Sequence, residues 1–487
     1  MLSLHHPPKS GRPVVATHKT IDFWKAVLRG DLGQVYLASH DPEVRSSLAF
    51  RIVETLTDKQ HGAKYRLRVV HCPPPHLLWI MRRRAETAAG FIHRAYCRAL
   101  WHERGFLGRL QLSAWYLAWP LIFALTSIWV TVLNGRAIAR RTGKSMARQV
   151  TEQFIVAWRF NCLPPSYYMF ELFDEQRLAR GRDYLHRFEL KGGIYRLMKS
   201  GAVARVVPSL GDKNEFTEWC KANNLPVPEV HLIHRAGNPI ATLKPPPGDL
   251  FIKTLRGTGG TGAEAWIHVA AGRYRSLLDG ECLAEVDLLE RIKRRNEDVI
   301  VETRLLNHDA IRDLSNGALM TVRLITFLNE TGTYEATHAG LRMAIGANRL
   351  VDNSHAGGII AAVDMKSGIL GPATDIGLRP IIGWCSHHPD TGAVIEGRVL
   401  PLWPETVALA CRAHAAFAPR VIVGWDIAIT SDGPTLIEGN SSPGIDLLQR
   451  AYREPVGNSR MGELIVFHLC NNPATLALIG DDAMSAN

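Results

Sequence analysis

Residues 424–444, GWDIAITSDGPTLIEGNSSPG, contain the pattern that decides the fold of this chain. Residues 426–430 are mostly apolar and β-branched, 431–433 carry the Ser-Asp-Gly of a tight turn, and 435–439 can return beside the first run. The stretch therefore predicts two antiparallel strands. The Ser-Ser-Pro-Gly that follows predicts a bend directly after the second strand.

Three oxygen-bearing side chains can share one face of this hairpin. Glu438 and Asn440 are two residues apart and so point to the same side, and Asp426 on the first strand can face the same space. Two carboxylates and an amide suit a hard cation such as Mg²⁺, which also binds substrate phosphates. The alternative is a hairpin with acidic residues on a solvated face.

The order of these residues resembles the metal site of the ATP-grasp superfamily: Asp426, then Glu-x-Asn twelve residues later, then Ser-Pro-Gly. The resemblance implies that Asp426, Glu438 and Asn440 bind Mg²⁺, or Mn²⁺ in its place, against the phosphates of ATP. It also implies an α+β chain with the ATP-grasp fold, in which two α+β lobes grip ATP.

A glycine-rich loop adds to the resemblance. Lys253 lies on a strand-like run and is followed at once by Arg-Gly-Thr-Gly-Gly-Thr-Gly, which places glycines at Gly257, Gly259, Gly260 and Gly262. Glycines allow the backbone amides to approach phosphate oxygens closely while Lys253 supplies a positive charge, although a flexible hairpin is the alternative. The loop matches neither a Walker loop nor a Rossmann fingerprint, and it resembles the ATP-grasp glycine loop.

The resemblance assigns three more nucleotide contacts. Lys213, near the start of an amphipathic helix at 212–221, matches the first phosphate-binding lysine of these proteins. Glu302 opens the segment that pairs its backbone with adenine and positions an acid for the ribose. Asp309 is the expected ribose contact, and its alternative role is to cap the next helix.

Four residues are expected to take part in catalysis. Arg323 lies inside the alternating run VRLITF and needs an anionic partner, either an internal carboxylate or a phosphate; the resemblance favours phosphate. Arg342 on the next strand could hold the carboxylate of the acceptor bidentately. Asn353 is expected to complete the metal or phosphate shell, and His355 is either a catalytic residue or a turn residue.

Composition describes a folded chain of two to four domains, with 46% hydrophobic and 21% charged residues over 487 residues. The eight cysteines form no C-x-x-C pair, which argues against a zinc or disulfide scaffold and fits a reducing cytosol. The N-terminus has no apolar run after its basic residues, so no secretory signal is expected. Residues 1–150 hold 23 Lys and Arg against 8 Asp and Glu, so the basic charge belongs to the N-terminal third.

A hydrophobic segment follows the basic residues. Residues 110–135 carry no charge, and as a helix the stretch 110–133 would cover roughly 36 Å, enough to cross a bilayer core. A single span would export the Arg-rich N-terminal part, because ATP keeps the rest of the chain in the cytosol. We therefore expect a re-entrant hairpin at Pro120, or a bent interfacial helix there, on the cytoplasmic face of the inner membrane; the alternatives are a true span and a buried helix of a soluble cytoplasmic protein.

The expected organisation is an N-terminal region without an assigned role and a hydrophobic membrane-type segment, then a helical lead-in and the ATP-grasp domain. The boundaries are 1–105, 106–136, 137–205 and 206–475, the last divided into an N-lobe at 206–305 and a C-lobe at 306–475. Lys253, the glycine loop, VRLITF, DNSHAGG and the hairpin together resemble most closely the sugar-transfer-associated branch of the superfamily.

That resemblance implies an ATP- and Mg²⁺-dependent ligase that joins a carboxylate to an amine or thiol through an acyl phosphate, in the synthesis or modification of cell-surface polysaccharide. The implied partners are ATP, an unidentified carboxylate substrate, sugar-transfer enzymes and the inner membrane surface, and no nucleic acid is expected. The alternatives are a phosphotransferase acting on a hydroxyl and a non-catalytic nucleotide-binding scaffold.

Overall fold

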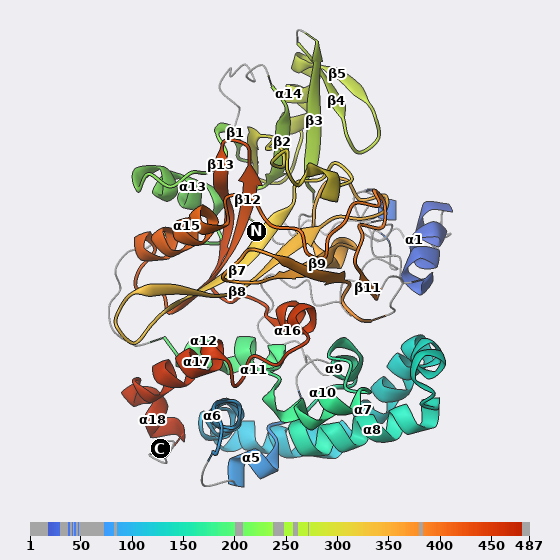
Figure 1. The fold of residues 1–487 in the computed structure, drawn as a ribbon, viewed down its shortest axis with the longest axis vertical. Coiled ribbons are helices and arrows are strands. Elements are labelled where there is room, and N and C mark those ends of the chain that lie inside the picture. The colour runs from blue at the N-terminus through green and yellow to red at the C-terminus, as the bar shows by residue number, and fades with distance from the viewer. Residues whose placement is uncertain are drawn as a thin grey trace, which may run out of the picture.

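Two antiparallel sheets and a base of helices make up the protein (Figure 1). The computed structural model describes residues 18–29, 73–81, 85–199, 208–236, 248–256, 262–270, 272–378 and 383–479, together with residues 38, 41, 43, 44 and 47. The mixture of helix and antiparallel sheet confirms the predicted α+β class. The expected helix SSLAFRIVETLT and the residues Arg82, Arg83 and Arg84 lie outside this description, apart from Ser47.

The first sheet has six strands in the order β1-β6-β2-β3-β4-β5. Its strands are β1 (Val230–His234), β2 (Leu250–Thr254), β3 (Glu264–Ala270), β4 (Arg273–Ser276), β5 (Cys282–Ala284) and β6 (Val299–Thr303). The helix α13 (Lys213–Ala222) precedes the sheet, and α14 (Glu285–Lys293) packs Leu288 and Ile292 against it. These elements form the N-lobe.

The second sheet has seven strands in the order β11-β10-β9-β8-β7-β12-β13. Its strands are β7 (Thr321–Leu328), β8 (Tyr334–Met343), β9 (Ile359–Val363), β10 (Leu370–Thr374), β11 (Trp384–Cys385), β12 (Ile422–Thr430) and β13 (Gly433–Asn440). The predicted hairpin is thus β12 and β13. All nine residues of β12 are buried, because β7 and β13 flank this strand and helices cover the sheet.

Helices cover both faces of the second sheet. On one face α15 (Trp403–Ala416), which was expected to be a core helix, packs Leu409 and Ala413 against Val322 and Leu324 of β7. On the other face Ile325 and Phe327 join a core that includes α6 and the C-terminal helices. Those C-terminal helices are α16 (Asp446–Tyr452), α17 (Arg460–Cys470) and α18 (Pro473–Ile479).

The helices before residue 200 form the base of the molecule in Figure 1. They are α5 (Leu77–Met81), α6 (Ala88–His102), α7 (Phe106–Thr142), α8 (Met146–Phe160), α9 (Pro164–Met169), α10 (Glu175–Ala179), α11 (Arg187–Glu189) and α12 (Tyr195–Leu197), and α1 (His18–Arg29) lies apart from them. Short 3₁₀ turns occur at Gly181–Asp183, Arg312–Leu314 and Ser354–Ala356, and a π turn at Leu190–Ile194. Since α6 shares a core with β7 and α17, the N-terminal helices pack as part of the same body as the second sheet.

The hydrophobic segment is one continuous helix. Helix α7 runs through Pro120 without a break, so the expected re-entrant hairpin is wrong. Gly143, in the left-handed conformation at φ 72°, ends α7, and the Ser145 side chain caps the start of α8. Among the described helices α7 is the one that is long and apolar enough to cross a membrane, judged by length and composition.

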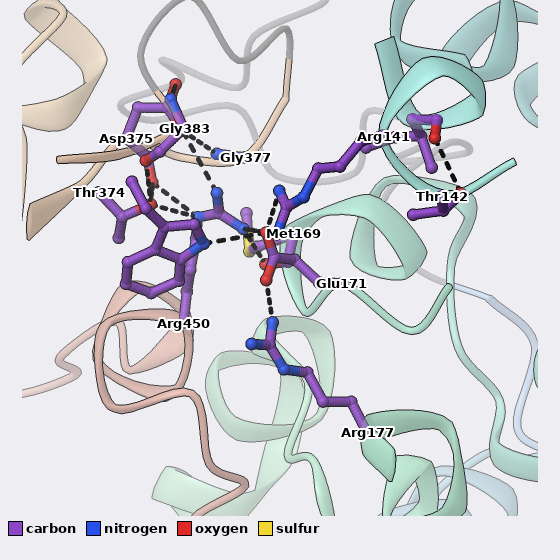
Figure 2. A network of polar contacts seen from close by, with 12 residues as sticks. Arg141, Thr142, Met169, Glu171, Arg177, Thr374, Asp375, Gly377, Gly383 and Arg450 are labelled. Atoms are coloured by element: carbon purple, nitrogen blue, oxygen red, sulfur yellow. Dashed lines mark hydrogen bonds and ion pairs between the residues drawn. The ribbon is translucent and has the colours of Figure 1, made fainter. Parts of the chain in front are cut away.

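A buried arginine ties the helical base to the second sheet (Figure 2). Arg450 of α16 donates to the Met169 carbonyl at 2.7 Å and to the Asp375 carbonyl at 2.9 Å, so it bridges α9 and the end of β10. Glu171 lies beside it and accepts from the indole of Trp384 at 2.9 Å. In Figure 2 the side chains of Arg141 and Arg177 also point toward Glu171.

This bridge predicts a large loss of stability on truncation. We expect Arg450→Met to lower the free energy of unfolding by about 3–5 kcal/mol, because it leaves the buried Glu171 without one of its cations. Arg460→Met is the matched control: Arg460 also pairs with two acids, but it is half exposed, so about 1 kcal/mol or less is expected. Urea denaturation followed by tryptophan fluorescence measures both, and equal losses would contradict the role assigned to Arg450.

Candidate active site

A row of charged side chains crosses three strands of the second sheet. Asp426 of β12 pairs in register with Arg323 of β7 on one side and with Glu438 of β13 on the other. Residues paired across antiparallel strands lie on the same face of the sheet. The structure therefore brings together two of the three predicted metal ligands and one predicted catalytic arginine.

A β-bulge makes this row possible. The register between β12 and β13 shifts at Ile437, so that Asp426 pairs with Glu438 while the next residue, Ile427, pairs with Leu436. Without the extra residue, Leu436 and Glu438 would point to the same face. The bulge lets Leu436 enter the core beneath α15 while Glu438 joins the charged row.

Asp426 is buried and held by two guanidinium groups. Arg323 Nε lies 2.5 Å from Asp426 Oδ1, Arg323 Nη2 lies 3.1 Å from Oδ2, and Arg342 Nη2 of β8 lies 2.9 Å from Oδ2. Burial raises the pKa of Asp426, but the two arginines outweigh it and hold that pKa below its usual value. Of the two partners expected for Arg323, the structure shows the internal carboxylate, and the contact with phosphate that the resemblance favoured stays a prediction.

Arg342 is enclosed by acceptors from within the protein. Its Nη2 donates to Thr321 Oγ1 at 2.6 Å, its Nη1 to Asn353 Oδ1 at 3.2 Å, and the guanidinium also lies 3.4 Å from Asp352 Oδ1. The side chain is one-tenth exposed, so its planar fork is not presented to a substrate carboxylate. The structure thus shows Arg342 holding Asp426 and Asn353, and the bidentate grip on an acceptor carboxylate stays a prediction.

Asp352 belongs to the site and was missed in the sequence. It is buried and accepts from the Thr321 backbone N–H at 2.8 Å and hydroxyl at 2.5 Å. Burial raises the pKa of Asp352 even though Arg342 and Thr321 act against it. The available signal was Arg342: a second arginine inside a strand demands a second acid, and Asp352 stands next to Asn353 in the DNSHAGG stretch.

The Gly-Gly pair after Asn353 shapes this corner. Gly357 is left-handed at φ 89°, and a Cβ on Gly358 would lie 2.4 Å from the Asp352 carbonyl oxygen. Only glycine allows this turn and this close approach. His355 lies in the 3₁₀ turn Ser354–Ala356, and its side chain is outside the described part of the protein, so its catalytic role stays a prediction.

The N-lobe contributes two lysines. Lys253 Nζ of β2 lies 2.8 Å from Glu302 Oε2 of β6, and both side chains are largely buried. Burial lowers the pKa of Lys213, the first residue of α13, and Lys253 lowers it further, while Glu438 and Glu302 act in the opposite direction. Lys213 thus lies close enough to Glu302 of the N-lobe and to Glu438 of the C-lobe for both carboxylates to act on its charge.

The glycine loop begins beside Lys213. Arg256 pairs with Asp212, the N-cap of α13, at 3.1 Å, and the Lys213 backbone N–H donates to the Leu255 carbonyl. Gly257, Gly259 and Gly260 lie outside the described residues. Gly262 is described and adopts φ 75°, a conformation that favours glycine, at the end of the loop.

Glu302, expected to open the adenine-binding segment, lies in a central strand of the first sheet. The backbone of β6, which includes Glu302, is hydrogen-bonded to β1 on one edge and to β2 on the other. Both edges of β6 are thus occupied by strands, and the backbone contact with adenine stays a prediction for the residues that follow Thr303. Asp309, expected at the ribose, is 71% exposed and pairs with Arg312 at 3.3 Å.

The oxygen donors fit a hard cation by type and by position. Asn440 Nδ2 donates to Glu438 Oε1 at 3.0 Å, which leaves Glu438 Oε2 and the Asn440 amide oxygen on the same strand face. A carboxylate offers about four acceptor positions, and Arg323 and Arg342 use three on Asp426. The described residues contain no cluster of three His, Cys, Asp or Glu side chains able to hold a metal, so an ion here needs Asn440 as well.

Three solved ligase structures are similar to part of this chain. The L-amino acid ligase from Bacillus licheniformis is 11% identical, with 55% of this chain and 48% of that chain covered and a TM-score of 0.31. D-alanyl-alanine synthetase A from Vibrio cholerae O1 biovar eltor is 14% identical, with 55% of this chain and 66% of that chain covered and a TM-score of 0.31. VanG D-Ala:D-Ser ligase from Enterococcus faecalis is 12% identical, with 53% of this chain and 62% of that chain covered and a TM-score of 0.31. This chain thus spans between about half and two thirds of the length of each.

A comparison with curated proteins gave no match. A comparison with models of protein families matched residues 196–460 to the model described as sugar-transfer associated ATP-grasp. The matched residues make up more than half of the chain and include α13, both sheets and the charged row. The chain therefore belongs to the sugar-transfer associated ATP-grasp family.

Proposed function

We propose that the protein is an ATP- and Mg²⁺-dependent ligase that joins a carboxylate to an amine, or to a thiol, through an acyl phosphate. The observation that carries the proposal is the meeting of two kinds of groups between the lobes. Lys213 and Lys253 of the N-lobe supply positive charge for phosphates, and Glu438 and Asn440 of the C-lobe supply oxygen donors for a cation.

The reaction has two balanced steps. An oxygen of the acceptor carboxylate attacks the γ-phosphorus of ATP, the bond to the β–γ bridging oxygen breaks, and ADP leaves. The amine or thiol then attacks the acyl carbon, phosphate leaves with the electrons of the C–O bond, and the nucleophile loses its proton to solvent. Both steps develop negative charge that fixed cationic groups stabilise.

Each residue of the row has a role in this scheme. Glu438 and Asn440 would hold Mg²⁺ together with the remaining acceptor position of Asp426, and the ion would neutralise charge on the phosphates when bound. Arg323 keeps Asp426 in place through Nε and Nη2, and its Nη1 has no partner among the described residues. We assign Arg323 Nη1 to the transferred phosphoryl group, and Arg342, Asp352 and Asn353 to the support of Asp426.

Family membership and helix α7 suggest where the ligase acts. We place it in the biosynthesis or modification of cell-surface polysaccharide, beside sugar-transfer enzymes and at the cytoplasmic face of the inner membrane. The family description names an association with sugar transfer, and α7 provides an apolar surface. The acceptor would then be a carboxylate on a glycan or on a glycan precursor.

One observation favours a second candidate, a nucleotide-binding scaffold without turnover. Arg323 and Arg342 occupy most of the acceptor positions of Asp426, the residue that the ligase needs as a metal ligand. Incubation with γ-labelled ATP, Mg²⁺ and candidate acids separates the possibilities. ADP with free phosphate and an amide or thioester indicates a ligase, a phosphorylated product indicates a phosphotransferase, and binding without turnover indicates a scaffold.

Glu438→Gln tests the metal site. We expect turnover of ATP to fall on the order of a hundredfold, because a neutral amide stabilises the cation and the transition state less well. Removal of Mg²⁺ by a chelator should have a comparable effect on the wild type and little further effect on the variant. Glu405→Gln, a change on the exposed side of α15, is the control and should retain full activity. Unchanged turnover and Mg²⁺ dependence in Glu438→Gln would overturn the assignment.

The Lys253–Glu302 pair tests the phosphate contact separately from folding. Lys253→Met leaves Glu302 buried without its cation and should destabilise the protein. In Lys253→Met/Glu302→Leu the buried charges are gone, so stability should recover. The affinity for ATP, measured by calorimetry with Mg²⁺, should stay about tenfold or more below that of the wild type. Recovery of both stability and ATP affinity in the double variant would show that Lys253 serves the fold alone.

A further inference from the structure

Helix α7 buries Ser127, Thr131 and Asn134 on its inner face. Ser127 Oγ donates to Gln153 Oε1 of α8 at 2.9 Å, and Gln153 Nε2 donates to Thr131 Oγ1 at 2.8 Å. Tyr168 of α9 donates its hydroxyl proton to Gln149 Oε1 at 2.9 Å, and its Oη lies 3.0 Å from Thr131 Oγ1, whose hydroxyl can donate to it. All five side chains are buried, so hydrogen bonds join α7 to its neighbours alongside the apolar contacts of Val130 and Ile138.

The outer face of α7 is apolar instead. Exposed large hydrophobic residues recur at helical spacing along it: Leu110, Leu117, Leu121, Leu125, Ile128 and Val132. Leu117 is 85% exposed and Leu121 is 67% exposed, so these side chains lie far outside any core. This distribution is the reverse of a helix on the surface of a water-soluble protein, and it needs an apolar partner.

Helix α8 extends the same surface. Phe154, Ile155 and Trp158 of α8 are exposed, and the Phe154 ring packs edge to face on Phe123 of α7 with centroids 4.9 Å apart. Figure 1 shows α7 and α8 side by side along the base, at the edge of the molecule away from the first sheet. We call the exposed apolar residues of these two helices the α7–α8 face.

The charges around the α7–α8 face identify its partner. Helix α7 contains no Asp or Glu, and Arg109, Arg136 and Arg140 are exposed toward its two ends. Trp129 and Trp158, whose rings combine an apolar body with a polar N–H, are 60% and 72% exposed. Apolar residues flanked by arginines and accompanied by tryptophan fit the interface of a bilayer that contains anionic lipids.

The packing of α7 decides how it meets that bilayer. Its 37 residues extend roughly 56 Å, well beyond the hydrocarbon thickness of about 30 Å. Its inner face is covered by α8 and α9, where Lys144 Nζ lies 2.8 Å from Glu152 Oε1 and Tyr167 donates to Glu152 Oε2 at 2.6 Å. Insertion of α7 across the bilayer would either place this ion pair and the buried polar contacts in the hydrocarbon or break them, both of which cost free energy. Contact through the outer face alone leaves them in place.

We propose that the α7–α8 face docks the protein on an anionic bilayer, with α7 lying in the plane of the membrane interface. This inference deepens the location given with the proposed function. It stands on the exposed surface of the helical base and not on the nucleotide site. In this arrangement the protein is a monotopic membrane protein, held by the outer surface of its helical base.

Flotation of the full-length protein with lipid vesicles tests the docking. Wild type is expected to float with vesicles of phosphatidylcholine and phosphatidylglycerol, and less with phosphatidylcholine alone, because Arg109, Arg136 and Arg140 favour anionic headgroups. The triple variant Leu117→Gln/Leu121→Gln/Leu125→Gln should lose about tenfold or more of its partitioning, since these side chains supply buried apolar area. Because all three are exposed, circular dichroism should show unchanged helicity.

A matched control makes the flotation result specific. Val286→Gln/Leu306→Gln/Val399→Gln replaces exposed apolar residues outside the helical base and should float like the wild type. A wild type that stays in the aqueous phase, or two triple variants that float equally, overturns the proposal. So does a wild type that remains in the membrane after alkaline carbonate extraction, which would indicate a spanning helix. Self-association through the α7–α8 face would overturn the proposal as well. It would appear as a wild-type dimer in the absence of lipid that does not float with vesicles and that becomes monomeric only in Leu117→Gln/Leu121→Gln/Leu125→Gln.

The flotation assay contains no nucleotide, so its result does not depend on whether the protein has ligase activity. Detergent-solubilised protein that turns over ATP but does not float would leave the proposed chemistry standing and remove the docking surface. Protein that floats but does not turn over ATP would do the opposite.

Discussion

The buried carboxylate of Asp426 constrains the whole C-lobe. A charge in the centre of a sheet is tolerated only when it is paired and hydrogen-bonded. Here Arg323 of β7, the strand beside β12, and Arg342 of β8, the next strand across the sheet, pair with Asp426. The pairing fixes the register of β12 against β7, and through Arg342 it fixes the turn that holds Asp352 and Asn353. Beyond the charged row, the same face of β7 becomes apolar at Ile325 and Phe327 and packs on the helical base.

Local pattern was sufficient to predict the elements of this site. The alternation of VRLITF, the turn at 431–433 and the helix start at Asp212 and Lys213 each act within a few residues, and each is present as expected. Family membership and the α+β class followed from the same motifs. Lys213, Lys253, Glu302 and Glu438 also come together, although no single motif places the two lobes against each other.

What the sequence could not supply depends on contacts between distant segments. The bulge at Ile437 exists because Leu436 has a core to enter beneath α15, and nothing within the hairpin itself requires it. Arg342 was assigned to a substrate because its internal partners, Thr321, Asp352 and Asp426, come from three separate segments. Pro120 suggested a break in α7, but the proline is accommodated within a single helix.

Residues from both lobes converge on one place, so a single bound nucleotide should slow amide hydrogen exchange in both lobes. Hydrogen–deuterium exchange of the full-length protein, with and without ATP and Mg²⁺, measures this directly. We expect slower exchange in the first turn of α13, in β2 and in β13 together, and only when the metal is present. Protection confined to one lobe, or none at all, would contradict the assignment of this seam as the ATP site.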